Sequence, residues 1–194
     1  MAGIRRFAAI EVGSYDIQMK IYEISQKFGI RELDDIRHVM ELGKDTYTHG
    51  KIGFEMAEEL CEVLCRFREI MKSYEVFDYR AKATSAVREA KNALILLDRI
   101  RVRTGFDVKI LSNSEQRFLC YKAVASREGE FNQIISKPTA IVDVGSGSIQ
   151  ISLFDKDALF STQNIRLGSL RVREMLPRVS VDSVHLELLI EELI

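Results

Sequence analysis

Two stretches of this sequence are near copies of one another, and each has the pattern of a strand, a tight turn and a second strand. The segment AAIEVGSYDIQMKIYE begins at Ala8, and AIVDVGSGSIQISLFD begins at Ala140. Six of the sixteen aligned positions are identical, and Glu11 is aligned with Asp143. Apolar and polar residues alternate after each turn with the two-residue period of a strand. Unrelated hairpins would share that alternation but seldom a common carboxylate, valine, glycine and serine, so we expect two related units.

Each copy carries residue types that suit phosphate binding with a metal ion. A carboxylate at the end of a buried strand can hold Mg²⁺, and a glycine turn lets backbone N–H groups approach phosphate oxygens without hindrance. Two such turns that faced one another would hold a chain of phosphates from both sides, which predicts phosphoryl transfer or phosphate hydrolysis. The competing interpretation is that each is only a tight hairpin, because glycine and serine are common turn residues.

The charge of the chain gives no general attraction for polyanions. Its 28 basic and 29 acidic residues leave a formal charge of −1, so we expect neither nucleic acid nor a membrane as a partner. An anionic ligand must therefore be bound locally. No apolar run approaches the roughly 20 residues that cross a bilayer, and the first residues lead directly into a strand pattern instead of a cleavable signal. These features predict a cytoplasmic location.

The three cysteines indicate reduced thiols. Their number is odd, and Cys61 and Cys65 lie four residues apart in a helical pattern, which is typical of the inner face of a helix and not of a disulfide framework. A metal site at this pair is the weaker interpretation, because two cysteines alone lack the other ligands that zinc requires.

The order of the predicted elements, with strands first and helices returning over them, predicts an α/β fold. We expect strands at residues 7–12, 17–22, within 31–42, 79–84, 108–111, 139–144, 149–154 and 159–166. We expect helices at residues 54–71, over most of 85–103, after an N-cap at Ser112 or Ser114, at 169–176 and at 181–194, with a polar loop at 43–53. The last helix is apolar and has no visible partner, which favours a longer protein or an oligomer such as a homodimer.

The polar stretch at residues 126–137, just before Pro138, is the predicted domain boundary. It divides the chain into residues 1–125, which hold the first glycine turn, and residues 126–194, which hold the second.

Taken with their flanks, these segments resemble the exopolyphosphatase and guanosine pentaphosphate phosphohydrolase (Ppx/GppA) family over nearly the whole chain. The most specific matches are the ATSAVREAKN segment that starts at Ala83 and the DVGSGS turn that starts at Asp143; ILSNSEQRFLCYKAV and NIRLGSLRVREM also match. The resemblance implies the two-lobed actin-like ATPase (ribonuclease H-like) fold. Because family members are longer, it also implies a complete first lobe and a truncated second lobe.

The resemblance implies a role for each matching residue. Glu115 would be the base that activates the attacking water, and Arg88 would contact phosphate through its guanidinium. Asp143 and Glu11 would hold Mg²⁺, and the phosphate cradle would consist of Gly13 and Ser14 from the first turn and Gly145, Ser146, Gly147 and Ser148 from the second. Two other interpretations stay open: Glu115 as a first-turn residue that the helix dipole favours, and Arg88 as a surface cation.

Several residues depart from the family pattern. The family usually has Asp at Glu11, Asn at Tyr15, Glu at Gln116, Arg at Phe118, and Thr-Glu at Ile149-Gln150. The change at Gln150 matters most, because a neutral amide cannot replace a carboxylate in binding Mg²⁺ or in taking a proton.

Two functions from different classes follow from this resemblance. The first is a Mg²⁺-dependent phosphoanhydride hydrolase that releases terminal phosphate from inorganic polyphosphate or pppGpp. The second is a catalytically weakened relative that binds polyphosphate or a guanosine alarmone as a regulator, which the amide at Gln150 suggests. An ATP-driven kinase-like or chaperone-like member of the same wider fold is a third possibility.

Overall fold

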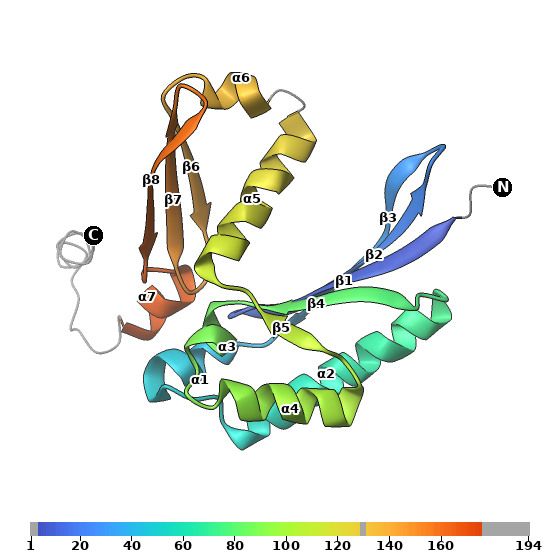
Figure 1. The fold of residues 1–194 in the computed structure, drawn as a ribbon. Coiled ribbons are helices and arrows are strands. Elements are labelled where there is room, and N and C mark those ends of the chain that lie inside the picture. Colours follow the sequence, from blue (N-terminus) through green and yellow to red (C-terminus); the bar gives the residue numbers. More distant parts are fainter. Residues whose placement is uncertain (1–3, 129–130, 176–194) are drawn as a thin grey trace. The chain divides into compact units, whose positions relative to one another are not determined.

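Two sheets organise the described part of the chain, which is residues 4–128 and 131–175 of a computed structural model (Figure 1). The chain divides into two units between Ile110 and Leu111, and each unit has its own sheet. Each unit is described by itself. The mixture of strands and helices in both units confirms the predicted α/β class.

The first unit contains a five-stranded sheet with the order β3-β2-β1-β4-β5. Strand β1 pairs antiparallel with β2 and parallel with β4, so it lies at the centre of the sheet. The strands are β1 (Arg5–Val12), β2 (Asp16–Ser25), β3 (Gly29–Val39), β4 (Asp78–Ala83) and β5 (Val108–Ile110). All five strands were predicted from their apolar patterns, with ends that differ by only a few residues.

The core of the first unit lies between this sheet and two helices, α2 (Phe54–Ser73) and α4 (Ala93–Thr104), which run side by side on one face (Figure 1). Helix α2 buries one stripe at helical spacing, and β1 and β2 bury every second residue against it. The buried side chains include Ala57, Leu60, Cys61, Leu64, Phe67 and Met71 of α2, with Ala8, Ile10, Val12, Ile17, Met19 and Ile21 of the strands.

The polar loop predicted at residues 43–53 is wrong, because helix α1 occupies Leu42–His49. Leu42 and Thr46 lie one turn apart and are both buried, and the Thr46 hydroxyl donates to the carbonyl of Ala86 at 3.0 Å. The helix ends at Gly50, whose φ of 72° lies in the left-handed region that glycine tolerates. Contacts with residues far along the chain therefore stabilise a helix whose own composition is polar.

The helix predicted over residues 85–103 is present as two helices, α3 (Ser85–Glu89) and α4, separated by a short break. The side chain of Asn92 explains the break. Its amide N–H donates to the carbonyl of Ile52 at 2.8 Å, and its oxygen accepts from the Ile52 N–H at 3.1 Å. This pair of hydrogen bonds fixes the break against the loop that precedes α2.

The second unit contains an antiparallel sheet of three strands, β6 (Thr139–Val144), β7 (Ile149–Asp155) and β8 (Ala158–Ile165). Its helices are α5 (Asn113–Glu128), α6 (Phe131–Ile135) and α7 (Ser169–Met175). Tyr121 of α5 packs edge-on against Phe154, and its hydroxyl donates to the Ser152 hydroxyl at 2.7 Å. Helix α5 therefore covers the face of the sheet to which Ser152 and Phe154 point.

The polar stretch at residues 126–137 contains the end of α5 and the whole of α6. The predicted domain boundary at residues 125 and 126 falls inside α5, whereas the two units divide before this helix. The strands and the helix predicted at residues 139–176 are confirmed. The helix predicted at residues 181–194 lies outside the described residues.

The three cysteines are free thiols, as the sequence indicated. Cys61 is buried in the α2 stripe, and burial raises the pKa of its thiol. Cys65 is exposed, so the prediction of an inner-face position is wrong for this residue. Within residues 4–128 and 131–175, no three side chains of the His, Cys, Asp or Glu type come together as a metal site. No helix in the same ranges is long and apolar enough to span a membrane.

Neighbouring positions on α2 give a test of this core. Leu64 is fully buried, so Leu64→Ala is expected to lower the free energy of unfolding by about 2–5 kcal/mol, through lost apolar contact and the cavity left behind. Cys65→Ala, one residue further on, is the control and is expected to change it by less than about 0.5 kcal/mol. Urea unfolding followed by circular dichroism measures both, and equal effects would contradict the packing described.

Candidate functional site

The repeat in the sequence is also a repeat in the structure. In the first unit Glu11 pairs with Gln18 and Val12 with Ile17; in the second, the equivalent pairs are Asp143 with Gln150 and Val144 with Ile149. The same hydrogen bond closes each turn. The N–H of Gly13 donates to the carbonyl of Asp16 at 3.0 Å, and the N–H of Gly145 donates to the carbonyl of Ser148 at 2.9 Å. The two hairpins are therefore built on one plan.

The chain folds back closely at the first position of both turns, and this excludes a side chain at Gly13 and leaves little room for one at Gly145. A Cβ atom on Gly13 would lie 2.6 Å from the carbonyl oxygen of Asp16, and one on Gly145 would lie 3.2 Å from that of Ser148. The first distance is shorter than any ordinary carbon to oxygen contact, so a side chain at residue 13 would open the turn. The glycines thus fix the close return of the chain at each turn.

The hydroxyl of Ser14 points into the first unit and is fully used there. It lies 2.8 Å from the Tyr47 hydroxyl and 2.9 Å from the Ser85 hydroxyl, and it accepts the N–H of Ala86 at 3.1 Å. One donor and two acceptors are all that a serine hydroxyl offers. Ser14 therefore joins the turn to the start of α3, and its backbone, not its hydroxyl, is the part that can meet a phosphate.

Arg88 lies on α3, three residues after Ser85, and is half-buried near Tyr47. Burial lowers the pKa of its guanidinium, while the charges of Glu89 and Tyr47 act in the opposite direction. Arginine still keeps its charge at any physiological pH. The first unit therefore brings Ser14 and Arg88, two of its predicted site residues, to one cluster at the turn.

The second turn, residues 145–148, is fixed by the first residues of α7. The N–H of Ser169 donates to the carbonyl of Gly145 at 3.2 Å, and that of Leu170 donates to the carbonyl of Ser146 at 3.0 Å. The Arg171 Nε donates to the carbonyl of Gly147 at 2.9 Å. Because these carbonyls are taken by α7, the turn is held in one conformation, with Gly145, Ser146, Gly147 and Ser148 brought together as predicted.

Gly168 is a structural residue of this turn that the sequence reasoning missed. A Cβ atom there would lie 2.3 Å from the carbonyl carbon of Ser146 and 2.4 Å from the nitrogen of Gly147. Only glycine lets the connection between β8 and α7 approach the turn so closely. A signal was present in the sequence, because Leu167-Gly168 follows the third strand of the second unit as Leu42-Gly43 follows that of the first. The N–H of Gly43 likewise donates to the carbonyl of Ser14, at 2.8 Å.

The two candidate metal ligands lie in different surroundings. Asp143, at the end of β6, is half-buried, and its charge adds to burial in raising the pKa of the Cys120 thiol, so it lies near α5. Glu11, the equivalent residue of β1, is exposed. Protein sites for Mg²⁺ often supply only one or two carboxylates, and water and phosphate oxygens complete the set. Asp143 is the half-buried carboxylate that such a site would use.

Glu115 is the third residue of α5 and forms a capping box with Ser112. Its Oε2 accepts the N–H and the hydroxyl of Ser112, each at 2.9 Å, and its own N–H donates to the Ser112 hydroxyl at 3.2 Å. Ser112 is therefore the N-cap, one of the two predicted. The interpretation of Glu115 as a first-turn residue describes this geometry. A role as base stays a prediction, and the cap holds the carboxylate in a defined position.

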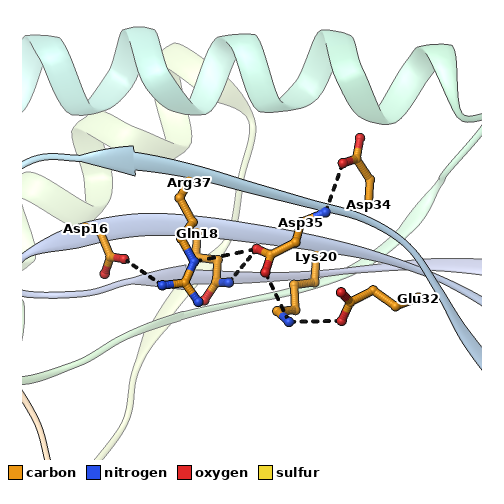
Figure 2. A network of polar contacts seen from close by, with 7 residues as sticks. All are labelled: Asp16, Gln18, Lys20, Glu32, Asp34, Asp35 and Arg37. Atoms are coloured by element: carbon orange, nitrogen blue, oxygen red, sulfur yellow. Dashed lines mark hydrogen bonds and ion pairs between the residues drawn. The ribbon is translucent and has the colours of Figure 1, made fainter.

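A network of charged side chains covers the sheet beside the first turn, on the face opposite the core (Figure 2). The amide of Gln18 donates to Asp35 at 2.5 Å, and Lys20 makes ion pairs with Asp35 at 3.2 Å and Glu32 at 2.9 Å. These hydrogen bonds lower the pKa of Asp35 and raise that of Lys20. Asp16, whose carbonyl closes the first turn, joins the network through an ion pair with Arg37 at 3.7 Å, so the network also holds the end of the turn (Figure 2).

Each unit therefore assembles its own set of predicted residues. Gly13, Ser14 and Arg88 come together in the first, and Asp143 and residues 145–148 in the second. The expectation that the two turns face one another stays a prediction.

Comparison with known proteins places these features in a family. Residues 20–184 match the model of the Ppx/GppA phosphatase family. Exopolyphosphatase 1 of Mycobacterium tuberculosis (strain ATCC 25618 / H37Rv) is 26% identical over 174 residues, which are 89% of this chain and 49% of that protein. A guanosine-5'-triphosphate,3'-diphosphate pyrophosphatase of Vibrio atlanticus is 20% identical over 162 residues, 84% of this chain and 31% of that protein. The chain thus spans half or less of the length of these curated relatives.

Two solved structures have the same fold. An exopolyphosphatase from Cytophaga hutchinsonii superimposes with a TM-score of 0.77 at 24% identity, over 92% of this chain and 55% of that one. The Ppx/GppA family member of Aquifex aeolicus gives a TM-score of 0.70 at 24% identity, over 89% of this chain and 54% of that one. The predicted actin-like α/β fold is confirmed, and coverage of about half agrees with one lobe and part of a second.

The contact between Gly168 and the second turn can be tested by adding one methyl group. Gly168→Ala is expected to lower the free energy of unfolding by about 1–3 kcal/mol or more, because the new Cβ overlaps the peptide between Ser146 and Gly147. Ser169→Ala changes an exposed neighbour whose backbone hydrogen bond is kept, so it should be nearly neutral. Thermal unfolding compares the two, and a Gly168→Ala variant as stable as the parent would rule out the close approach.

Proposed function

Because the chain belongs to the Ppx/GppA phosphatase family, we propose that it serves a Mg²⁺-dependent hydrolase that releases terminal phosphate from inorganic polyphosphate or pppGpp. The observation that carries this proposal is the repeated glycine turn. In both units a carboxylate precedes the turn, the flanking strands pair in the same register, and the same hydrogen bond closes the turn. Backbone N–H groups of such turns bind phosphate oxygens. The names of the relatives from Mycobacterium tuberculosis and Vibrio atlanticus support the two substrate classes.

The second turn would bind the substrate through its backbone. The carbonyls of residues 145–147 are held by α7, which keeps the turn in one shape before the substrate binds. A preorganised turn does not have to reorder its N–H groups as negative charge develops on the phosphate oxygens. Arg88 adds a guanidinium that can contact two phosphate oxygens at once. Asp143, with Glu11 as its counterpart, would hold Mg²⁺, which neutralises phosphate charge when it is bound.

Water attacks the terminal phosphorus in the proposed reaction, and the bond from phosphorus to the bridging oxygen breaks. The bridging oxygen leaves with the electron pair on the shortened chain, and the carboxylate of Glu115 takes the proton of the water. Ser112 fixes one oxygen of that carboxylate through two hydrogen bonds. The capping box and the base role are compatible, because the cap sets the position of the group that accepts the proton.

A regulatory protein that binds the same ligands is the second candidate function. Gln150 favours it, because this residue pairs with Asp143 across the sheet and carries an amide where the family usually has a carboxylate. Such a protein would bind polyphosphate or a guanosine alarmone and release no phosphate. We also propose a cytoplasmic location. The nearly balanced charge supports the absence of a nucleic-acid or membrane partner, and the apolar sequence of residues 181–194 supports a homodimer.

Substitution of Glu115 separates its two roles. Glu115→Gln is expected to reduce phosphate release by about 10² or more, because an amide cannot accept the proton. Its stability should stay within about 0.5 kcal/mol of the parent, because glutamine also completes a capping box. The assay measures phosphate released from polyphosphate and from pppGpp, with and without Mg²⁺, by the full-length protein.

Ser112→Ala is the matched control, because it removes the capping hydroxyl but keeps the Glu115 carboxylate and the Ser112 N–H that donates to it. It should lower the free energy of unfolding by about 1 kcal/mol. Its rate of phosphate release should fall much less than that of Glu115→Gln. Equal rates for Glu115→Gln and the parent would remove the assigned base. Micromolar ligand binding with no phosphate release from either substrate would favour the regulatory function.

A further inference from the structure

Three polar residues lie side by side across the second sheet, next to its glycine turn. Asp143 pairs with Gln150, and Gln150 pairs with Asn164, so their side chains share one face of β6, β7 and β8. Ser152 and Phe154 follow Gln150 at two-residue spacing and contact Tyr121 of α5. The row formed by Asp143, Gln150 and Asn164 therefore lies on the face that α5 covers.

The amide of Gln150 is buried without a protein partner. The residue is 2% exposed, and among the described residues neither its Nε2 nor its Oε1 has a hydrogen-bond partner. The same holds for the Oδ1 of Asn164 and, on α5, for the Oδ1 of Asn113 and the Nε of Arg117. Buried polar groups in folded proteins are nearly always paired with protein, water or a ligand. Five of the eight such atoms in the described residues belong to the second unit, and Gln150 alone contributes both polar atoms of its amide, so the row can hold a bound molecule.

The first unit shows that such a row need not be left unpaired. Its equivalent row is Glu11, Gln18 and Arg37, with the same pairing across β1, β2 and β3. There the row faces away from α2, and the Gln18 amide donates to Asp35 within the charged network (Figure 2). In the second unit the covered face is the opposite one. The sequence repeat explains why both units have a glutamine at this position. It does not explain why the amide of Gln150 is buried without a hydrogen-bond partner in the described residues.

The charges and hydrogen-bonding groups of the row indicate which kind of molecule it can bind. A bare anion would meet the negative charge of Asp143, and a bare cation would leave the N–H donors of Gln150 unpaired. The unpaired atoms are N–H donors at Gln150 and Arg117 and carbonyl acceptors on the three amides. Only a molecule that both donates and accepts hydrogen bonds serves both kinds of group. Water does so, and a buried water typically makes about three hydrogen bonds to groups of this kind.

We propose that Gln150 is a positioning residue, whose side-chain amide holds an ordered water beside the turn at residues 145–148. The inference rests on the proposed hydrolysis: this water is the one whose oxygen bonds to phosphorus as the bridging bond breaks. Its proton goes to the Glu115 carboxylate, because an amide accepts a hydrogen bond but not a proton. In small GTPases a glutamine orients the attacking water in the same way. The amide thus replaces one function of a carboxylate, which is orientation, and leaves proton transfer to another residue.

The test compares two glutamines at equivalent positions of the repeat. Gln150→Met keeps the length of the side chain and removes both hydrogen-bonding atoms. It is expected to lower kcat for phosphate release by about 10- to 100-fold, with KM within about threefold, because a misplaced reactant slows the chemical step more than binding. Gln18→Met is the matched control and should leave both constants near those of the parent. Gln150→Glu keeps an acceptor for water and should recover most of kcat, with one further ionisation in the pH profile.

A second readout separates this inference from the proposed function. In a high-resolution crystal structure of the full-length protein, a water is expected within hydrogen-bond distance of the Gln150 amide, and it should be lost in Gln150→Met. If the parent releases no phosphate from either substrate, the proposed function fails, while a water on this amide still supports the site. A row that holds no water overturns the inference. So does a Gln150→Met variant with the kcat of the parent, or one in which only KM changes.

Discussion

The hydrogen bond that closes each repeated turn, from a glycine N–H to a carbonyl three residues later, is the constraint on which the rest of the site depends. It requires glycine at residue 13, where a Cβ would lie 2.6 Å from the accepting carbonyl oxygen, and favours glycine at residue 145, where that distance is 3.2 Å. Once the turn is closed, the carboxylate before it lies at a fixed place in the ladder. The neighbouring segments are fixed in turn, α3 through the Ser14 hydroxyl and α7 through the carbonyls of the second turn. Phosphate binding as proposed then uses backbone N–H groups of the two turns, which these hydrogen bonds hold in a fixed conformation.

The two units use one hairpin in opposite ways. In the first unit α2 covers the face that carries Ile10 and Val12, which are almost fully buried. The equivalent residues of the second unit, Val142 and Val144, are 53% and 66% exposed, and α5 covers the other face. This difference places Gln18 in a surface network and Gln150 in a buried layer. A single repeated segment thus supplies a structural amide in one unit and, as proposed, a water-positioning amide in the other.

Much of this structure could be predicted from the sequence, because strand alternation and the conserved spacing of the repeat are local patterns. They predicted the strands, and they narrowed the N-cap to Ser112 or Ser114, of which Ser112 is the one observed. What they could not give depends on contacts far along the chain. Helix α1 forms because Leu42 and Thr46 are buried against distant residues, and Gly168 matters only because it meets the turn at Ser146. The two-residue period of β7 also does not tell which face of the strand is covered. Hydrophobicity alone would predict that the face with Ile149, Ile151 and Leu153 is covered, whereas α5 covers the face with Gln150.

The central claim is that both glycine turns bind phosphate through their backbone N–H groups. Titration of the ¹⁵N-labelled full-length protein with tripolyphosphate and Mg²⁺, followed by amide resonances, tests it most directly. The account predicts that the resonances of residues 13–15 and 145–148 move most and saturate together. Saturable binding that leaves both turns unmoved, or that moves one and not the other, would contradict it.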